Sequence, residues 1–226
     1  MSSPEQSPKN LREIYGLFVA GLFSSISLSD VVRAISAEAD RIETRRHPIG
    51  FTHAELTSSA GALDGERVRV HVWLGATESR DNLGDLHEHT WDLTSLVLAG
   101  SVVDTTLRAS RDTLGKYQGS RIIYGDLNSS EPIGRFNLET LQRRRVEAGA
   151  VYTIPARTVH LNEVGSLPTV TLVRSIEDKL GHGPLVFSLP SADAVSVTSV
   201  RPQVDTADVL SELVAALHGE DSDSRE

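Results

Sequence analysis

Three histidines are the residues of this chain with the clearest capacity for chemistry. His87 and His89 form a His-x-His pair, and His160 follows in a separate segment. On a β-strand, residues two apart point to the same face, so the pair would present both imidazoles together. A third histidine from a partner strand would complete a tripod of nitrogen ligands for a divalent metal. The spacing therefore predicts a metal centre formed by His87, His89 and His160.

The surroundings of the histidines strengthen this prediction. Because the chain has eight histidines, chance alone yields ~0.3 His-x-His pairs, and the pair by itself is weak evidence. However, the apolar segment after the pair ends at Gly100, and a second segment carries Gly149, Pro155 and His160. These positions resemble the two motifs of the cupin superfamily, Gly-x5-His-x-His-x3-4-Glu-x6-Gly and Gly-x5-Pro-x-Gly-x2-His-x3-Asn. The resemblance covers roughly residues 68–176 and implies a small β-barrel that holds a metal on the three histidines.

The chain departs from these motifs at four positions. The motif glutamate falls on Leu93, so the usual carboxylate ligand is missing. Strand parity points Asp92 away from the face of the histidine pair, and only a β-bulge would make Asp92 a ligand. The first glycine, the second-motif glycine and the asparagine fall on Asp81, Arg157 and Val164.

The missing glutamate bears on the chemistry of the predicted centre. Three neutral imidazoles, with no acidic group alongside, leave the charge of a divalent metal uncompensated and part of its coordination sphere open. Such a centre favours an anionic ligand, and at iron that ligand would also prepare the metal for dioxygen. The alternative is a closed zinc site that only stiffens the barrel. It needs a fourth protein ligand, and none is evident.

The three-histidine set is similar to that of the thiol dioxygenases, which are cupins without the glutamate. The resemblance is partial, because those enzymes place a tyrosine after the last metal histidine and some crosslink it to a cysteine. Here the four tyrosines all precede His160, and cysteine is absent. We therefore infer neither the crosslink nor cysteine as the substrate.

The resulting hypothesis is a metal-dependent, non-haem oxidoreductase of the dioxygenase type. It places Fe(II) at the three histidines, with a small anionic metabolite and dioxygen as substrates and no organic cofactor. Two alternatives stay open. A zinc- or nickel-type cupin isomerase, lyase or hydrolase would polarise a carbonyl or activate water, and a non-catalytic cupin would bind a small molecule without converting it.

Further site residues follow from strand parity. Arg69 and His71 share one face with Trp73; if that face points inward, Arg69 holds a carboxylate and His71 serves as acid, base or donor to a ligand. The opposite orientation is equally sensible, because the valines between these residues would then form the core face. Trp91 is expected to line the pocket, and Asn162 shares a face with His160 and would orient a ligand.

The long segment between the two motifs predicts a decorated rim of the barrel. Its candidate entrance residues, which would bind substrate, are Tyr117, Arg121 and Tyr124. The remaining histidines have no partner spacing and are expected to be surface or locally bonded side chains. They are His47, His53, His182 and His218.

The elements that must position these residues are mostly β-strands. From about residue 50 the hydrophobic period changes to two, with turns between short segments. We predict strands at residues 67–74, 93–103, 118–125, 141–146, 151–154 and 169–176. The predicted fold class is mostly β, a cupin-type antiparallel β-barrel (double-stranded β-helix) with N-terminal helices and one C-terminal helix.

The chain divides into an N-terminal helical extension (1–50), the barrel (51–200), a C-terminal helix (201–219) and a disordered acidic tail (220–226). Helical spacing of apolar residues predicts one helix from Leu11 to Leu22 and a second from Leu28 to Ile42. Ser27 and Ser29 are candidate N-caps of the second. These helices are expected to pack on the barrel wall or on a second subunit, and a homodimer sealed by the terminal helices is the predicted assembly.

Composition excludes some partners and suggests a compartment. The formal charge of -9 comes from 31 acidic and 22 basic side chains, which disfavours nucleic acid and anionic lipid surfaces. The basic run 143–145 is expected to be a solvated strand edge. The absence of cysteine fits a reducing compartment, and the most apolar stretch, residues 14–28, is too short to span a bilayer. We expect a cytoplasmic protein.

Overall fold

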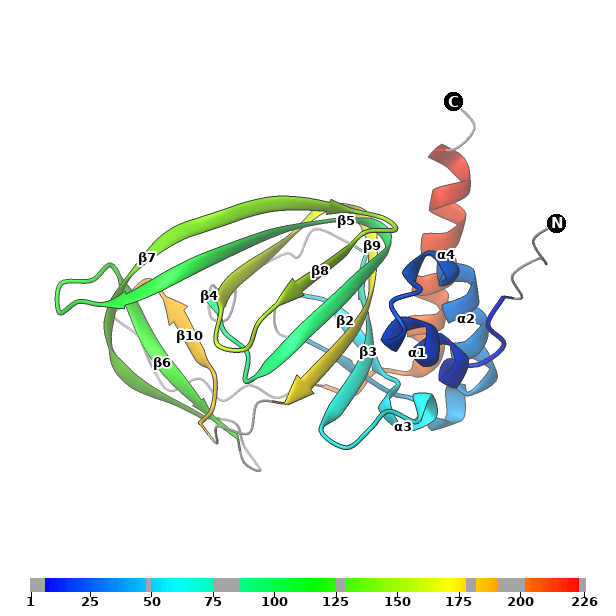
Figure 1. Cartoon of the computed structure of the whole chain (residues 1–226), viewed down its shortest axis with the longest axis horizontal. Coiled ribbons are helices and arrows are strands. Elements are labelled where there is room, and N and C mark those ends of the chain that lie inside the picture. The colour runs from blue at the N-terminus through cyan, green and yellow to red at the C-terminus, as the bar shows by residue number, and fades with distance from the viewer. Residues whose placement is uncertain are drawn as a thin grey trace.

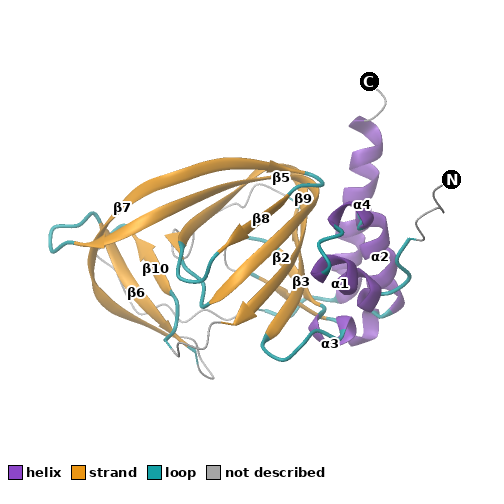
Figure 2. Cartoon of the chain, viewed as in Figure 1, coloured by secondary structure: helices purple, strands orange, loops and turns teal. Residues whose placement is uncertain are grey.

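Helices gather at one end of a β-barrel in the computed structural model (Figures 1 and 2), which describes residues 7–47, 50–74, 86–124, 129–177, 182–190 and 202–223. The strands are β1 (Glu43–Arg46), β2 (Thr52–Glu55), β3 (Glu66–Trp73), β4 (Leu86–His87), β5 (Trp91–Arg111), β6 (Tyr117–Ile123), β7 (Ser129–Glu147), β8 (Val151–Ile154), β9 (Val159–Glu177) and β10 (Leu185–Ser188). The helices are α1 (Leu11–Val19), α2 (Leu28–Ala37), α3 (Thr57–Ala60) and α4 (Thr206–Asp223), with 3-10 turns at Phe23–Ser25 and Ala39–Arg41.

Antiparallel pairings close the barrel. β4 pairs with β9, β9 with β5, β5 with β7, β7 with β6, β6 with β10, and β10 again with β4. β3, β2 and β1 extend the sheet from the C-terminal half of β9, and β8 pairs with the N-terminal end of β5. The two long strands β5 and β9 therefore connect both parts. The predicted mostly β fold, an antiparallel barrel with helices before and after it, is confirmed.

The predicted strands coincide with observed ones, but several are longer than expected. The segments 67–74 and 151–154 correspond to β3 and β8, whereas 93–103, 141–146 and 169–176 are parts of β5, β7 and β9. β6 ends at Ile123, and Gly125 of the segment 118–125 lies outside the described residues, as does Asp81. β1, β2, β4 and β10 were not anticipated, and β1 lies within the segment 1–50.

Gly100 lets β5 pass from one part of the sheet to the other. Its φ is +67°, and a Cβ atom at this position would lie 2.3 Å from the carbonyl oxygen of Pro168 and 2.4 Å from Oγ1 of Thr169. The register between β5 and β9 shifts on both sides of this glycine. A residue without a side chain is thus required where β5 passes the backbone of Pro168 and Thr169.

The N-terminal helices begin where the sequence indicates and end earlier. Ser27 caps α2: its side chain accepts a hydrogen bond from the Asp30 backbone, and the Asp30 carboxylate accepts one from the Ser27 backbone. α2 ends at Ala37, so Ile42 lies beyond it. α4 runs to Asp223, into the segment expected to be disordered, and residues 224–226 lie outside the described part of the chain.

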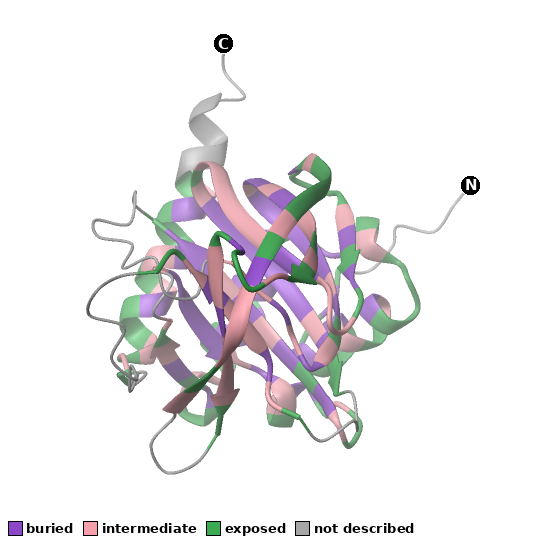
Figure 3. Ribbon diagram, turned by 90° about the vertical axis from the view of Figure 1, so that its left-hand side faces the viewer, coloured by how far each residue is buried: buried purple, intermediate pink, exposed green. Residues whose placement is uncertain are grey.

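The helices pack against one face of the sheet. Val68, Val70 and Val72 of β3 form a single apolar core with α1, α2 and α4, so the barrel wall is the surface that the helices cover. Because side chains alternate along a strand, Arg69, His71 and Trp73 occupy the opposite face. Figure 3 shows the resulting mixture of buried, intermediate and exposed positions along the strands. The homodimer stays a prediction.

The open edge of β1 is covered by the segment that leads into α4. The Arg46 backbone donates to the carbonyl of Pro202 over 3.0 Å, and the Val204 backbone donates to the carbonyl of Thr44 over 3.1 Å. The hydroxyl of Thr44 also donates to the Val204 carbonyl. The C-terminal segment thus takes the place of a neighbouring strand. Among the described residues, no helix is long and apolar enough to cross a membrane.

Candidate metal centre

The structure brings the three predicted histidines together. His87 ends β4, His89 follows it, and His160 lies near the start of β9, directly opposite His87 in the β4–β9 register. One nitrogen of each ring lies within 4.8 Å of the others. The ring centroids are 4.6 to 4.9 Å apart. This convergence gives one cation room to contact all three rings.

The chemistry of the donor set fits a divalent metal. His160 is 1 % exposed, and neither of its ring nitrogens has a hydrogen-bond partner among the described residues. Burial, followed by the nearby imidazoles of His87 and His160, lowers the pKa of His89 well below its usual value. A neutral imidazole is the form that binds a metal. The arrangement therefore supports one divalent ion, without selecting iron, zinc or nickel.

No carboxylate joins the three imidazoles within the part of the chain that is described. Leu93, at the position of the motif glutamate, is 8 % exposed and packs in an apolar cluster with Ile154 and Val173. Asp92 is exposed and accepts a hydrogen bond of 2.8 Å from the backbone of Ala156. Its predicted orientation away from the histidines is confirmed.

An acidic side chain nevertheless lies beside the centre, which corrects the expectation that none does. Asp104 on β5 is 1 % exposed, and its Oδ1 lies 3.6 Å from Nδ1 of His160. Arg144 on β7 donates from Nε to the other carboxylate oxygen over 3.0 Å. Arg144 therefore does not belong to a purely solvated basic run, because it compensates a buried carboxylate.

Asn162 shares the face of His160, as predicted. Its side-chain nitrogen donates to the hydroxyl of Tyr152 over 3.3 Å, and its buried Oδ1 has no partner among the described residues. Burial raises the pKa of Tyr152 to about 12, so this phenol stays protonated near neutral pH. Among the described residues, Asn162 thus offers a free acceptor beside the candidate ligand His160.

Arg157, which replaces the second-motif glycine, keeps the backbone conformation of a glycine and adds side-chain contacts. Its φ is +64°, the left-handed region in which the motif glycine would carry no strain. The side chain donates to Glu88 over 3.2 Å and to the carbonyl of His182 over 2.7 Å. Glu88 lies between the two motif histidines; burial raises its pKa, although Arg157 acts in the opposite direction. Arg157 therefore anchors the segment that carries His87 and His89.

A second group of rings lies on the face of β3 that points away from the helices. His71 stacks on Phe51 at 4.4 Å between centroids and lies 6.2 Å from His53. Phe51 also stacks on His47 at 4.4 Å and contacts Trp73 at 5.0 Å. The imidazoles of His47 and His71 are the last-named causes of the lowered pKa of His89, after burial and the imidazoles of His87 and His160.

Of the histidines expected to be surface or locally bonded, His47 is half-buried and stacks on the nearby ring of Phe51, whereas His53 is not a surface residue. His53 is 5 % exposed and lies opposite His71 in the β2–β3 register. His53 lies 6.3 Å from His47 and 6.2 Å from His71 between ring centroids. The sequence pattern gave no signal for this because β2 is a strand of only four residues.

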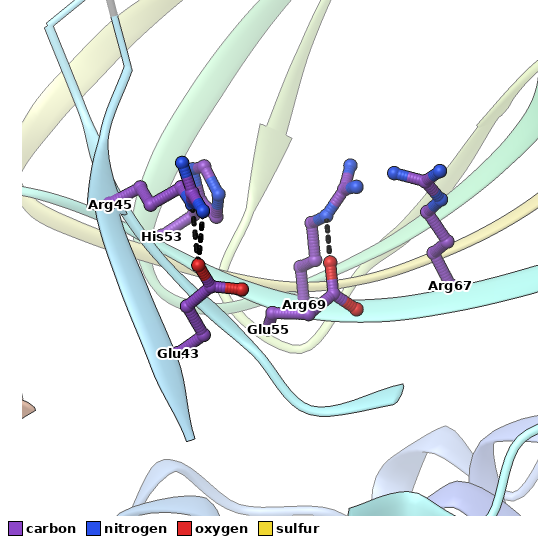
Figure 4. A pocket seen from close by; sticks show the side chains of 6 residues that line it. All are labelled: Glu43, Arg45, His53, Glu55, Arg67 and Arg69. Atoms are coloured by element: carbon purple, nitrogen blue, oxygen red, sulfur yellow. Dashed lines mark hydrogen bonds and ion pairs between the residues drawn. The ribbon is translucent and has the colours of Figure 1, made fainter. Parts of the chain in front are cut away.

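Three arginines, two glutamates and His53 line a cavity beside this group (Figure 4). Its volume is about 280 Å³, and its lining residues come from β1, β2 and β3: Glu43, Arg45, His53, Glu55, Arg67 and Arg69. Arg69 donates to Glu55 over 2.7 Å, and Arg45 pairs with Glu43. Arg67 pairs with no carboxylate among the described residues. The three guanidinium groups exceed the two carboxylates by one positive charge.

The predicted entrance residues do not gather at this cavity. Tyr117 packs against the core of Phe136 and Phe187, Arg121 lies in β6 where its charge acts on Glu88, and Tyr124 is 53 % exposed after the end of β6. Their substrate-binding role stays a prediction.

Comparison with known proteins gives structural likenesses alone. No protein-family model and no curated protein matches the chain. The DMSP lyase DddQ from Ruegeria pomeroyi DSS-3 is 15 % identical over 86 % of this chain and 84 % of its own, with a TM-score of 0.43. A match described as crystal structures of the DMSP lyases RdDddP and RnDddQII is 18 % identical over 73 % of this chain and 70 % of its own, with a TM-score of 0.42. The hydroquinone 1,2-dioxygenase PnpCD is 15 % identical over 79 % of this chain and 83 % of its own, with a TM-score of 0.35.

These low identities and TM-scores say nothing of substrate or reaction. The evidence for the fold lies in the chain itself: two motif segments, an antiparallel barrel, and three imidazoles that meet where β4 pairs with β9. The chain thus forms an antiparallel β-barrel with a candidate three-histidine metal centre, and its two motif segments resemble those of the cupins.

Proposed function

We propose that the protein is a metal-dependent enzyme that converts a small anionic substrate, with Fe(II) as the metal and dioxygen as the second substrate. The observation that carries this proposal is the cluster of three imidazoles without a carboxylate ligand among the described residues. A bound divalent metal would supply Lewis acidity and, as Fe(II), electrons for the reduction of dioxygen. Because Asp104 is paired with Arg144, the centre retains its preference for an anionic ligand.

The residues of the chain would bind and orient the substrate. In this proposal Arg69 and Arg67 attract its anionic group, and His71 faces the substrate as a donor or acceptor of a proton. Asn162 offers its unpartnered Oδ1 to a hydroxyl or amino group. Trp91 forms part of the wall, and the aromatic rings around Phe51 exclude water.

Metal analysis and oxygen uptake test the proposal together. Freshly purified protein should contain about one transition metal ion per chain. The Fe(II)-loaded protein, screened against small carboxylates, should consume dioxygen in proportion to the substrate lost. Turnover by the zinc or nickel form without dioxygen would contradict the oxygenase and favour the isomerase, lyase or hydrolase. Tight binding without turnover would favour a binding protein.

The arginine-lined cavity has its own test. Arg67→Gln and Arg69→Gln should each raise the KM or the Kd of an anionic substrate by about 10- to 100-fold and change kcat less, because they remove an ion pair with the bound anion. Arg108→Gln is the control, since Arg108 forms an exposed pair with Glu139. Unchanged affinity in both cavity variants would show that the anion binds elsewhere.

A further inference from the structure

We propose that Asp104 is a positioning residue for His160: its Oδ1 accepts a hydrogen bond from Nδ1 of His160 and leaves Nε2 for the metal. This inference rests on the proposed function to the extent that His160 is a metal ligand. It adds to the centre a carboxylate from a position that lies outside both motifs.

The contact is buried, and no described residue competes for either of its two atoms. The two side chains are 2 % and 1 % exposed, and the Oδ1 to Nδ1 distance is 3.6 Å. Neither atom has a hydrogen-bond partner within the described part of the chain. A shift of about 0.5 Å would bring the pair within hydrogen-bond distance. Because an unsatisfied buried acceptor is costly, the free oxygen of Asp104 favours this contact.

The strand register aims the carboxylate at the ring. Asp104 lies opposite Asn162 and Thr106 opposite His160 in the β5–β9 ladder, so Asp104 and His160 belong to neighbouring pairs on one face. Arg144 holds Oδ2 and is itself fixed by the carbonyl of Thr153 at 3.0 Å. Its guanidinium also lies 5.6 Å from the ring centroid of Tyr152. The free oxygen is thereby directed toward His160.

The hydrogen bond has two consequences for a metal ligand. It selects the tautomer with the proton on Nδ1, and it makes Nε2 a stronger donor. Leu93 replaces the motif glutamate, so no carboxylate at that position would bind the ion directly. Asp104 would act on the ion only through the ring of His160, because its charge is compensated by Arg144. Such partners contribute about 10- to 100-fold to metal affinity.

A purely structural role of Asp104, as partner of Arg144, is the competing explanation. Two matched variants separate the roles: Asp104→Asn removes the charge that faces His160, and Arg144→Gln removes the ion pair but keeps the carboxylate. The probe is Zn²⁺, titrated into metal-free full-length protein against a chelating dye, with thermal unfolding of the metal-free protein as the second readout.

We expect Asp104→Asn to weaken Zn²⁺ binding by about 10- to 100-fold and Arg144→Gln by about 3-fold or less, at similar losses of thermal stability. The inference would be overturned if Asp104→Asn bound Zn²⁺ as tightly as wild type, or if both variants lost the same amount of Zn²⁺ affinity. Should Asp104→Asn fail to fold, ¹⁵N NMR of the wild-type zinc form decides: a protonated Nδ1 on His160 supports the inference, and a zinc-bound Nδ1 overturns it.

His160→Ala separates the inference from the proposed function. If this variant binds Zn²⁺ as tightly as wild type, the three-histidine centre itself fails. If it loses Zn²⁺ while Asp104→Asn binds normally, only the role of Asp104 fails.

Discussion

The indole of Trp91 lies flat on the imidazole of His89, with ring centroids 4.9 Å apart and planes inclined by 20°. Trp91 is the first residue of β5, so its backbone is held by pairing with β9. The stack restrains the orientation of His89, which itself lies outside the strands. A ring restrained in advance loses less freedom when it becomes a ligand.

Replacing His160 with alanine should abolish stoichiometric metal binding and leave the protein folded. The imidazole is one of three donors, and two donors hold a divalent ion far less tightly. Metal content by elemental analysis and the circular dichroism spectrum check both statements. His53→Ala is the matched control, because His53 is also buried but lies outside the three-histidine group. Full metal content in His160→Ala would remove this residue from the centre.

Leu93→Glu should create a fourth ligand. In the metal-free protein the buried carboxylate should lower the free energy of unfolding by about 2 to 4 kcal/mol, and Zn²⁺ should restore much of it. The same variant should bind anionic ligands less tightly at the metal. Leu96→Glu is the control, since Leu96 is buried on the face that packs against the helices. Equal rescue of both variants by Zn²⁺, in thermal unfolding, would show that Leu93 is remote from the metal.

Gly100→Ala should destabilise the protein more than Gly149→Ala. Both glycines have positive φ, but a Cβ at Gly149 meets no atom within 4 Å, whereas at Gly100 it meets two oxygens closer than 2.5 Å. We expect a loss of about 1 kcal/mol for Gly149→Ala and of more than about 2 kcal/mol for Gly100→Ala. Urea unfolding of the two variants measures the difference. Similar losses would mean that β5 and β9 can separate at the bend without cost.

Glu66 should contribute to stability above acidic pH. Burial raises the pKa of Glu66, but hydrogen bonds from Arg174 and Tyr15 outweigh this effect and hold the pKa below its usual value. A depressed folded-state pKa gives stability that is present above the unfolded-state pKa and is lost as the pH falls through the folded-state pKa. Glu66→Gln should therefore cost about 1 to 3 kcal/mol near neutral pH.

The difference between wild type and Glu66→Gln should shrink below about pH 4. Urea unfolding at a series of pH values gives this profile. Glu139→Gln provides the comparison, because Glu139 forms an exposed pair with Arg108 at 3.4 Å and should change stability by less than about 0.5 kcal/mol. A constant difference across the pH range would assign the effect of Glu66 to packing.

The metal centre was predictable because the spacing of its histidines is visible in short segments of the sequence. Two histidines two residues apart share a face on any extended chain, and the third lies in a segment with its own recognisable spacing. Parity also placed Asp92 outside and Asn162 on the face of His160. The alternating pattern of β3 did not show which of its faces points into the barrel, because either the valines or the residues between them could form the inward face. The packing of three valines on the helices decides it.

Asp104, His53 and the cavity arginines were not predictable in the same way. Asp104 reaches His160 through the register of β5 with β9, and His53 reaches His71 through the register of β2 with β3. Register depends on side-chain packing and on turns between strands, and a shift by one residue would exchange the two faces. Arg144 likewise belongs to a basic run in sequence, and only the β5–β7 pairing shows that it contacts a buried carboxylate.

The cover over β1 by residues 202–204 has a consequence for how the protein is made. A chain emerging from a ribosome exposes Glu43–Arg46 long before Pro202 is available to bond it. Throughout that interval the backbone groups of the strand are open to any other extended polypeptide. The arrival of residues 202–204, rather than formation of the barrel, is the event that ends this exposure.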